Sequence, residues 1–157
     1  MEFVFSMLSL IIALAALFFS IWQFFAERRR NRSEATIHAF DELEAAVFSD
    51  PAYKKLPTGD EALRFALSDQ NEWNAATLAL SRMEHFAVGV NCGIYDIHTL
   101  NRMAGGFLID EYARWDPVIV TKRRRDPHQK HYDEFERLCQ RLRLLRQKSY
   151  KKSWGPS

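Results

Sequence analysis

The chain has 157 residues, of which 47% are hydrophobic and 27% charged, and its formal net charge is +2. This length suits one small domain, and two cysteines are too few for the disulfide framework of a small secreted protein. The near-neutral total conceals a segregation of charge. Residues 33–121 carry 6 basic and 14 acidic residues, whereas residues 122–157 carry 12 basic and 4 acidic ones. We therefore expect an acidic body followed by a basic segment.

An uncharged run extends from Phe3 to Ala26. As an α-helix it would be about 36 Å long, enough to cross a bilayer core of about 30 Å. It is longer than a signal-peptide core of about 7–15 residues, and no small-residue cleavage site ends it. Four arginines follow, here termed the basic cuff: Arg28, Arg29, Arg30 and Arg32. The positive-inside rule predicts a single-pass anchor over residues 1–32, with its N-terminus outside and the remaining chain in the cytoplasm.

Small and polar residues recur along the anchor at spacings of three and four, which places them on one face of a helix. This small-residue stripe consists of Ser6, Ser9, Ala13, Ala16, Ser20 and Gln23. Lipid gives little hydrophobic drive for helix pairing, so membrane helices approach closely where side chains are small. The stripe predicts packing against another membrane helix, from a second copy or a different protein. The alternative is that alanine and serine are simply tolerated there.

The remainder of the chain shows helical periodicity and no convincing strand. Helices are expected over residues 33–48, 61–67, 70–92, 97–103, 107–122 and 127–147. A connector is expected at 52–60, with room for one helical turn. The first of these either continues the membrane helix or restarts at Ser33. We expect residues 33–147 to form a small irregular all-α bundle in the cytoplasm and residues 148–157 to form a loose basic tail.

Capping residues predict where several helices begin and end. Asp69 and Glu72 have the spacing of a capping box at the start of the 70–92 helix, and Gly93 follows its end. Asp96 is expected to cap the next helix.

Glycine and proline predict the remaining boundaries. Gly105 and Gly106 are expected to break the helix at about residue 103, and Pro117 to kink the one after it. Asp126 followed by Pro127 predicts the start of the last helix.

Two groups of residues suggest metal binding or catalysis, although a structural role is the stronger interpretation of each. His128 and His131, near Asp133 and Glu134, have the spacing of metal ligands. They also lie in the first turns of a helix beside Arg123–Arg125, where a solvated helix end is expected.

Glu84, His85 and Asp96 suggest acid–base chemistry, but adjacent residues of a helix point about 100° apart. Cys92 and Cys139 have no resolving partner in the sequence, so buried small side chains are expected. We therefore predict no catalytic residue, no metal and no cofactor.

A basic sector begins at Lys122 and continues through the last helix. Three uses are open: pairing with the acidic body, contact with anionic lipid or an acidic partner, and, as the least favoured, nucleic-acid binding. The residues expected to make cytoplasmic contacts are Trp115, Arg123, Arg124 and Arg125.

Several local motifs resemble a family of uncharacterised bacterial proteins, the domain of unknown function 4760. They are Met83–Val90, Gly93–Asp96, Trp115 with Pro117, Arg123, and Tyr132–Glu136. The resemblance covers about residues 70–140. It implies one N-terminal membrane helix followed by a cytoplasmic helical domain, and it transfers no activity.

These features predict a non-enzymatic accessory or regulatory subunit in the bacterial inner membrane. Its membrane helix would pack into a larger assembly, and its helical domain would dock a partner beside anionic lipid headgroups. The alternative is a self-associating membrane effector of a bacterial antiviral defence system. A third interpretation, an enzyme with a pocket between its helices, rests only on Glu84, His85 and Asp96.

Overall fold

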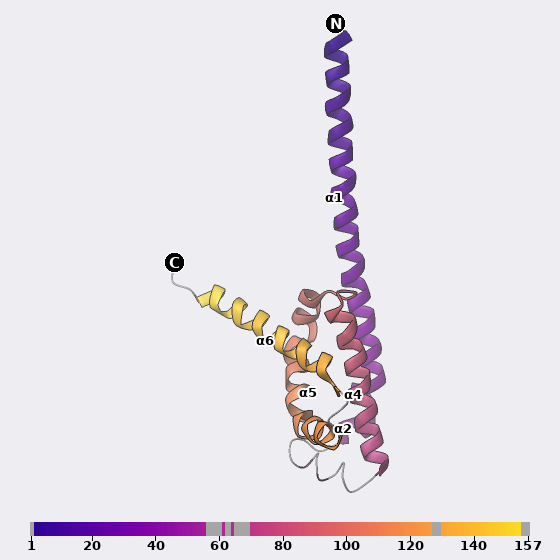
Figure 1. The fold of residues 1–157 in the computed structure, drawn as a ribbon, viewed down its shortest axis with the longest axis vertical. Coiled ribbons are helices and arrows are strands. Elements are labelled where there is room, and N and C mark those ends of the chain that lie inside the picture. Colours follow the sequence, from indigo (N-terminus) through magenta and orange to yellow (C-terminus); the bar gives the residue numbers. More distant parts are fainter. Residues whose placement is uncertain (1, 56–60, 62–63, 65–69, 127–129, 155–157) are drawn as a thin grey trace.

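The computed structural model describes residues 2–55, 61, 64, 70–126 and 130–154. The regular elements of this part of the chain are all helices, and it contains no strand, which confirms the predicted all-α fold (Figure 1). Its elements are α1 (Glu2–Leu43), a π-helical segment η1 (Glu44–Phe48), α2 (Pro51–Lys55), α4 (Gln70–Asn91), α5 (Ile97–Arg125) and α6 (Asp133–Trp154). The expected helix over residues 61–67 and the N-cap Asp69 fall outside the described residues, apart from Glu61 and Arg64.

The longest element is α1, a helix of 42 residues that passes Ser33 without a break. Figure 1 shows its N-terminal part projecting far beyond the other helices, while its C-terminal part lies against them. By length and composition α1 could span a membrane. Its last turns belong to the domain core, because Phe40 and Leu43 are only 7% and 6% exposed. The apolar projection and the folded domain therefore share one helix.

The core forms where α4 and α5 both pack against α6 and against α1. The apolar periodicity of α4 predicts a seam of Trp73, Ala76, Leu80, Met83, Ala87 and Val90. All of them are buried except Trp73, which is partly buried against the core. The largest side chains with less than 2% exposure include Trp115 and Phe135, from α5 and α6. Burying side chains of this size stabilises the fold by roughly 1.5–3 kcal/mol each.

The predicted break at Gly105 and Gly106 is wrong, because α5 is one helix of 29 residues. Both glycines instead leave room for neighbouring side chains. A Cβ atom on Gly105 would lie 2.5 Å from Oδ1 of Asn101, and one on Gly106 would lie 3.4 Å from Nη2 of Arg146 in α6. A glycine within a helix costs about 1 kcal/mol relative to alanine, so packing can outweigh it.

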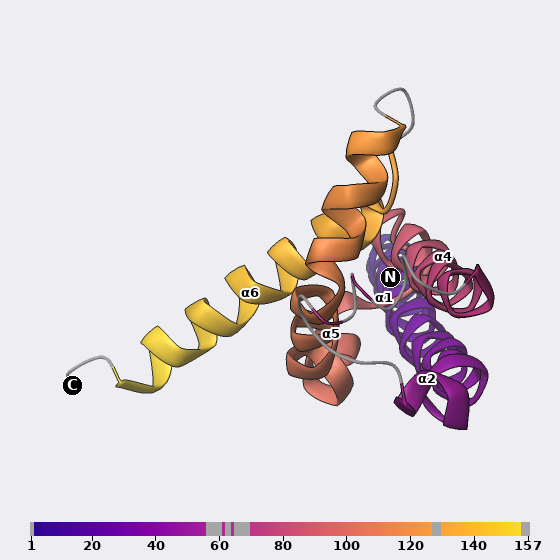
Figure 2. The same cartoon turned by 90° about the horizontal axis from the view of Figure 1, so that it is seen from below.

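The predicted start of the last helix is also wrong. Asp126 ends α5, since its N–H donates to the carbonyl of Lys122 at 3.1 Å, and α6 begins at Asp133. Pro127 lies outside the described residues. The expected loose tail from Lys148 is helical as far as Trp154. Figure 2, which looks along the long axis of the molecule, shows this end of α6 leaving the bundle sideways.

Hydrogen bonds at the turn between α4 and α5 hold α1 against the domain. The Thr36 hydroxyl is fully buried, donates to the carbonyl of Arg32 at 2.6 Å and accepts from the N–H of Asp96 at 2.7 Å. A second hydrogen bond, of 2.7 Å between the hydroxyl groups of Ser33 and Thr99, also joins α1 to α5. The predicted N-cap is confirmed, because Asp96 Oδ1 accepts from the N–H of Thr99 at 2.7 Å.

The predicted end of α4 at Gly93 is confirmed as well. Gly93 has φ +76°, in the left-handed region that favours glycine after a helix. The next two N–H groups, of Ile94 and Tyr95, both donate to the carbonyl of Gly89, at 2.9 and 3.2 Å. The turn is therefore compact and presents Ile94 beside α1.

Thr36→Val should lower the free energy of unfolding by about 1–3 kcal/mol, because the N–H of Asp96 loses its acceptor inside the domain. Urea unfolding followed by tryptophan fluorescence measures this loss. The matched control is Thr77→Val, since the Thr77 hydroxyl bonds to the Trp73 and Asn74 carbonyls of its own helix. Equal effects of the two substitutions would contradict a special role for Thr36.

Candidate functional site

The projecting part of α1 exposes large apolar side chains on every face. Phe18, Trp22 and Phe25 are 76%, 62% and 61% exposed. In water such a surface would be strongly unfavourable, and it far exceeds the scattered exposed hydrophobic residues of soluble domains. This surface needs either lipid or another protein around it.

The described members of the small-residue stripe, Ala13, Ala16, Ser20 and Gln23, are all exposed along this projection. The Ser20 hydroxyl donates to the carbonyl of Ala16 at 2.9 Å, so it is already bonded within the helix. The side chains of Ser6 and Ser9 lie outside the described part. The stripe therefore offers a shallow surface with one amide, from Gln23, among its described members.

The basic cuff divides into two parts. Arg28, Arg29 and Arg30 are exposed, and Nε of Arg30 pairs with Oε1 of Glu34 at 2.8 Å one helical turn later. Arg32 is partly buried and faces the turn after α4, where its Nη2 atom lies 3.0 Å from the position of a Cβ on Gly93. One arginine of the cuff is thus part of the domain interface.

A hollow of about 430 Å³ lies between α1 and the turn after α4, at the point where the apolar segment ends. Because it adjoins the helix that could span a membrane, we term it the juxtamembrane hollow, and its lining residues are Phe24, Glu27, Arg28, Asn31, Arg32, Ala35 and Ile94. The sequence prediction included the two arginines and missed the others. An isoleucine directly after a helix-ending glycine was the sequence signal that could have indicated Ile94.

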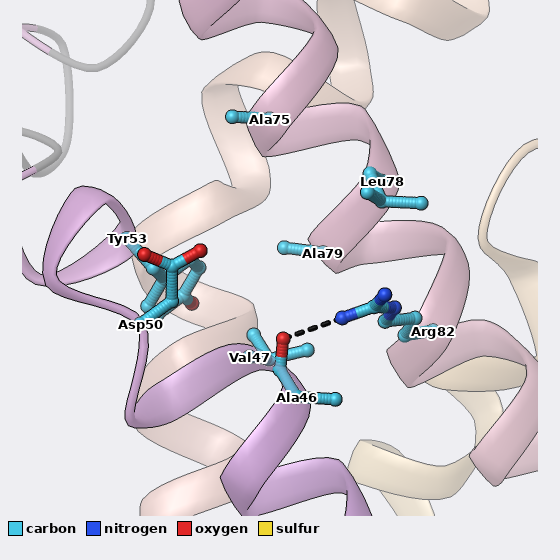
Figure 3. A pocket seen from close by; sticks show the side chains of 8 residues that line it. All are labelled: Ala46, Val47, Asp50, Tyr53, Ala75, Leu78, Ala79 and Arg82. Atoms are coloured by element: carbon cyan, nitrogen blue, oxygen red, sulfur yellow. Dashed lines mark hydrogen bonds between the residues drawn. The ribbon is translucent and has the colours of Figure 1, made fainter.

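Among the described residues of the domain, two further hollows can be delineated. The first, between η1, α2 and α4, measures about 70 Å³. At its edge Arg82 donates to the carbonyl of Ala46 (Figure 3). This volume holds only a few water molecules. The second measures about 320 Å³ and is mainly apolar, with Phe40, Met103 and Phe107 in its walls.

Arg123 is engaged inside the domain, at the corner between α5 and α6. Its guanidinium donates to the carbonyl of His131 at 2.8 Å, to Glu136 at 2.8 Å and to Asp133 at 2.9 Å. Burial opposes the charged form, but the bonds to Glu136 and Asp133 outweigh it and raise the pKa of Arg123. Of the predicted contact residues on α5, Arg124 and Arg125 are exposed.

Trp115, also predicted as a contact residue, is 1% exposed and belongs to the core. Its Nε1 atom donates to the Tyr53 hydroxyl at 2.8 Å, and that hydroxyl donates to the buried carboxylate of Glu111. Burial, followed by the bond to Glu111, raises the pKa of Tyr53. The prediction of a surface role for Trp115 is therefore wrong, since it ties α2 to α5.

Glu84 and Asp96, the two carboxylates that suggested acid–base chemistry, each accept hydrogen bonds from the start of a helix. Glu84 in α4 accepts from the first N–H groups of α6: Oε1 from Glu134 at 3.1 Å and Oε2 from Phe135 at 2.7 Å. His85 points to the surface, and Asp96 caps α5. This arrangement explains why α6 can begin without a capping side chain directly before it.

No group of three metal-binding side chains occurs within the described residues, and His128 is outside them. His131 lies 3.6 Å from the carboxylate of Asp126. The two cysteines differ. Cys139 is buried as predicted, with its thiol directed at the carbonyl of Leu108 at 3.5 Å, whereas Cys92 is exposed, contrary to the prediction.

These observations define a class: an all-helical domain built onto the end of a long apolar helix. The family model described as "Domain of unknown function (DUF4760)" matches residues 10–142. The chain therefore belongs to this family, which confirms the resemblance seen in its sequence motifs. None of the curated proteins and none of the solved structures matches it.

Glu84→Ala should lower the free energy of unfolding by about 1–2 kcal/mol, because two N–H groups at the start of α6 lose their acceptor. Urea unfolding detects the change, and circular dichroism tests for fraying of α6. His85→Ala is the adjacent control and should have little effect. Similar losses from both would mean that Glu84 does not act as the cap.

The two cysteines should react very differently with a maleimide at pH 7.5 in the folded protein. Burial raises the pKa of Cys139 to about 12, so almost no thiolate exists at this pH, and the side chain is inaccessible. Cys92 should be labelled alone, giving one adduct by intact mass spectrometry. Labelling of Cys139 without denaturant would contradict the described core.

Proposed function

We propose that the protein is a membrane-anchored accessory or regulatory subunit, without catalysis of its own, in the inner membrane of a bacterium. The observation that carries the proposal is the continuity of α1, which runs from the exposed apolar segment into the domain core. A continuous helix transmits position and rotation, whereas a flexible linker would not. The domain would therefore be held at a fixed height and in a fixed orientation over the membrane.

Its orientation follows from charge. The four arginines of the basic cuff favour the cytoplasmic side, so the domain would lie in the cytoplasm with the N-terminus outside. The cuff and the exposed basic residues of α6 would then both face anionic headgroups of the inner leaflet. In Figure 1 the free end of α6 lies level with the part of α1 that leaves the bundle, which supports this arrangement.

The contact in the membrane would be the small-residue stripe. Ala13 and Ala16 let a neighbouring backbone approach closely, and Gln23 offers an amide to a partner helix. On the cytoplasmic side, the apolar hollow of about 320 Å³ offers a docking surface, because Met103 and Phe107 in its walls are each 43% exposed. Two contact surfaces on one rigid unit suit a protein that positions other subunits.

The proposal is tested by solubilising the tagged full-length protein from its native membrane in a mild detergent. Mass spectrometry then identifies the co-purified proteins, and native mass gives the stoichiometry. We expect a stoichiometric set of unrelated membrane subunits. A pure homo-oligomer would contradict the proposal and favour the self-associating effector, whose expression should also increase membrane permeability.

The double variant Ala13→Leu, Ala16→Leu should reduce recovery of the partner subunits by about tenfold, since two bulky side chains separate the helices. Label-free quantification of the co-purified proteins measures the loss. Ala15→Leu is the matched control, because it makes the same change about 100° around the helix from Ala16. Equal losses in both variants would mean that the stripe is not the contact face.

A further inference from the structure

The juxtamembrane hollow combines apolar and charged walls at a single level of α1. Phe24 and Ile94 are 61% and 60% exposed, and they lie beside the side chains of Arg28, Asn31 and Arg32. The hollow begins where the apolar run of α1 ends. In the membrane orientation proposed above, on which this inference rests, one wall meets acyl chains and the other meets phosphates.

Arg32 brings a positive charge to the wall of the hollow. Its Nε atom is buried and makes no hydrogen bond to any of the described residues. Gly93 allows this close approach, because a Cβ at that position would lie 3.0 Å from Nη2 of Arg32. The Nε–H is shielded from solvent, so the terminal nitrogens of Arg32 are the donors that a ligand in the hollow can reach. A guanidinium binds phosphate oxygens through charge-assisted hydrogen bonds.

The formal charges of the lining favour one class of ligand. Arg28 and Arg32 supply two positive charges and Glu27 one negative charge, which leaves a net charge of +1. A phosphodiester carries a single negative charge and would balance it. The Glu27 carboxylate and the Asn31 amide can bind hydroxyl groups beside the phosphate.

We infer that the juxtamembrane hollow binds the headgroup of an anionic phospholipid that carries one phosphodiester and free hydroxyl groups, as phosphatidylglycerol does. The apolar walls distinguish this ligand from soluble phosphate, because only a lipid places hydrocarbon against Phe24 and Ile94. The bound lipid would fill the angle between α1 and the turn after α4 and so brace the domain against the membrane.

The test uses the full-length protein in a neutral detergent, incubated with equal amounts of phosphatidylglycerol and phosphatidylcholine and examined by native mass spectrometry. We expect one phosphatidylglycerol to be retained in preference to phosphatidylcholine. Arg28→Gln should reduce its retention by about tenfold to a hundredfold, the effect of losing one charge-assisted hydrogen bond. Arg29→Gln removes the same charge outside the hollow and should leave retention unchanged.

Equal loss in Arg28→Gln and Arg29→Gln would overturn the inference, because it would indicate general attraction to the cuff. Equal retention of both lipids would overturn it as well. Displacement of the lipid by millimolar inorganic phosphate would assign the hollow to a soluble anion instead. Because lipid retention is measured on the isolated protein, its failure is distinguishable from failure to recover partner subunits.

Discussion

The arrangement of the whole molecule depends on the buried hydroxyl of Thr36. It donates to a backbone carbonyl of α1 and accepts from the N–H of Asp96, the N-cap residue of α5. Without this link and the neighbouring bond between Ser33 and Thr99, α1 would meet the domain mainly through apolar contacts, which tolerate sliding and rotation. The directional bonds of Thr36, Ser33 and Thr99 instead define one rotational setting of α1 against α5. The position of the domain relative to any membrane depends on that setting.

The basic residues of the C-terminal segment form ion pairs mainly with carboxylates of the same segment. The ion pairs described for its basic residues join carboxylates at the corner between α5 and α6, as Arg123 does with Asp133 and Glu136. Further along α6, Arg143, Arg146 and Lys148 remain exposed. The separation of acidic body and basic segment therefore leaves charge available on the free end of α6, where an anionic surface or an acidic partner can reach it.

The sequence was sufficient for features that depend on periodicity and local caps. The α4 seam, Gly93 and the Asp96 cap were all predicted, because each depends on residues within one or two turns. The errors arose where distant residues decide the outcome. Gly105 stays helical inside packed α5, and α6 starts at Asp133 because Glu84, about fifty positions earlier, caps it. For the site, the cuff was predictable from charge, but the hollow required knowing that Ile94 meets α1.

Because α1 is uninterrupted, the number of residues between its apolar segment and the domain determines both the height and the rotation of the domain. Inserting one residue between the apolar segment and Ser33 would turn the domain by about 100° and move it about 1.5 Å from the membrane. Seven inserted residues would make nearly two full turns and restore the facing direction, but about 10 Å further away. Insertion could thus change the height of the domain while nearly keeping its facing direction, but it could not change the facing direction at constant height. Homologous chains that keep the same partner geometry should then differ in this segment by whole helical repeats rather than by single residues.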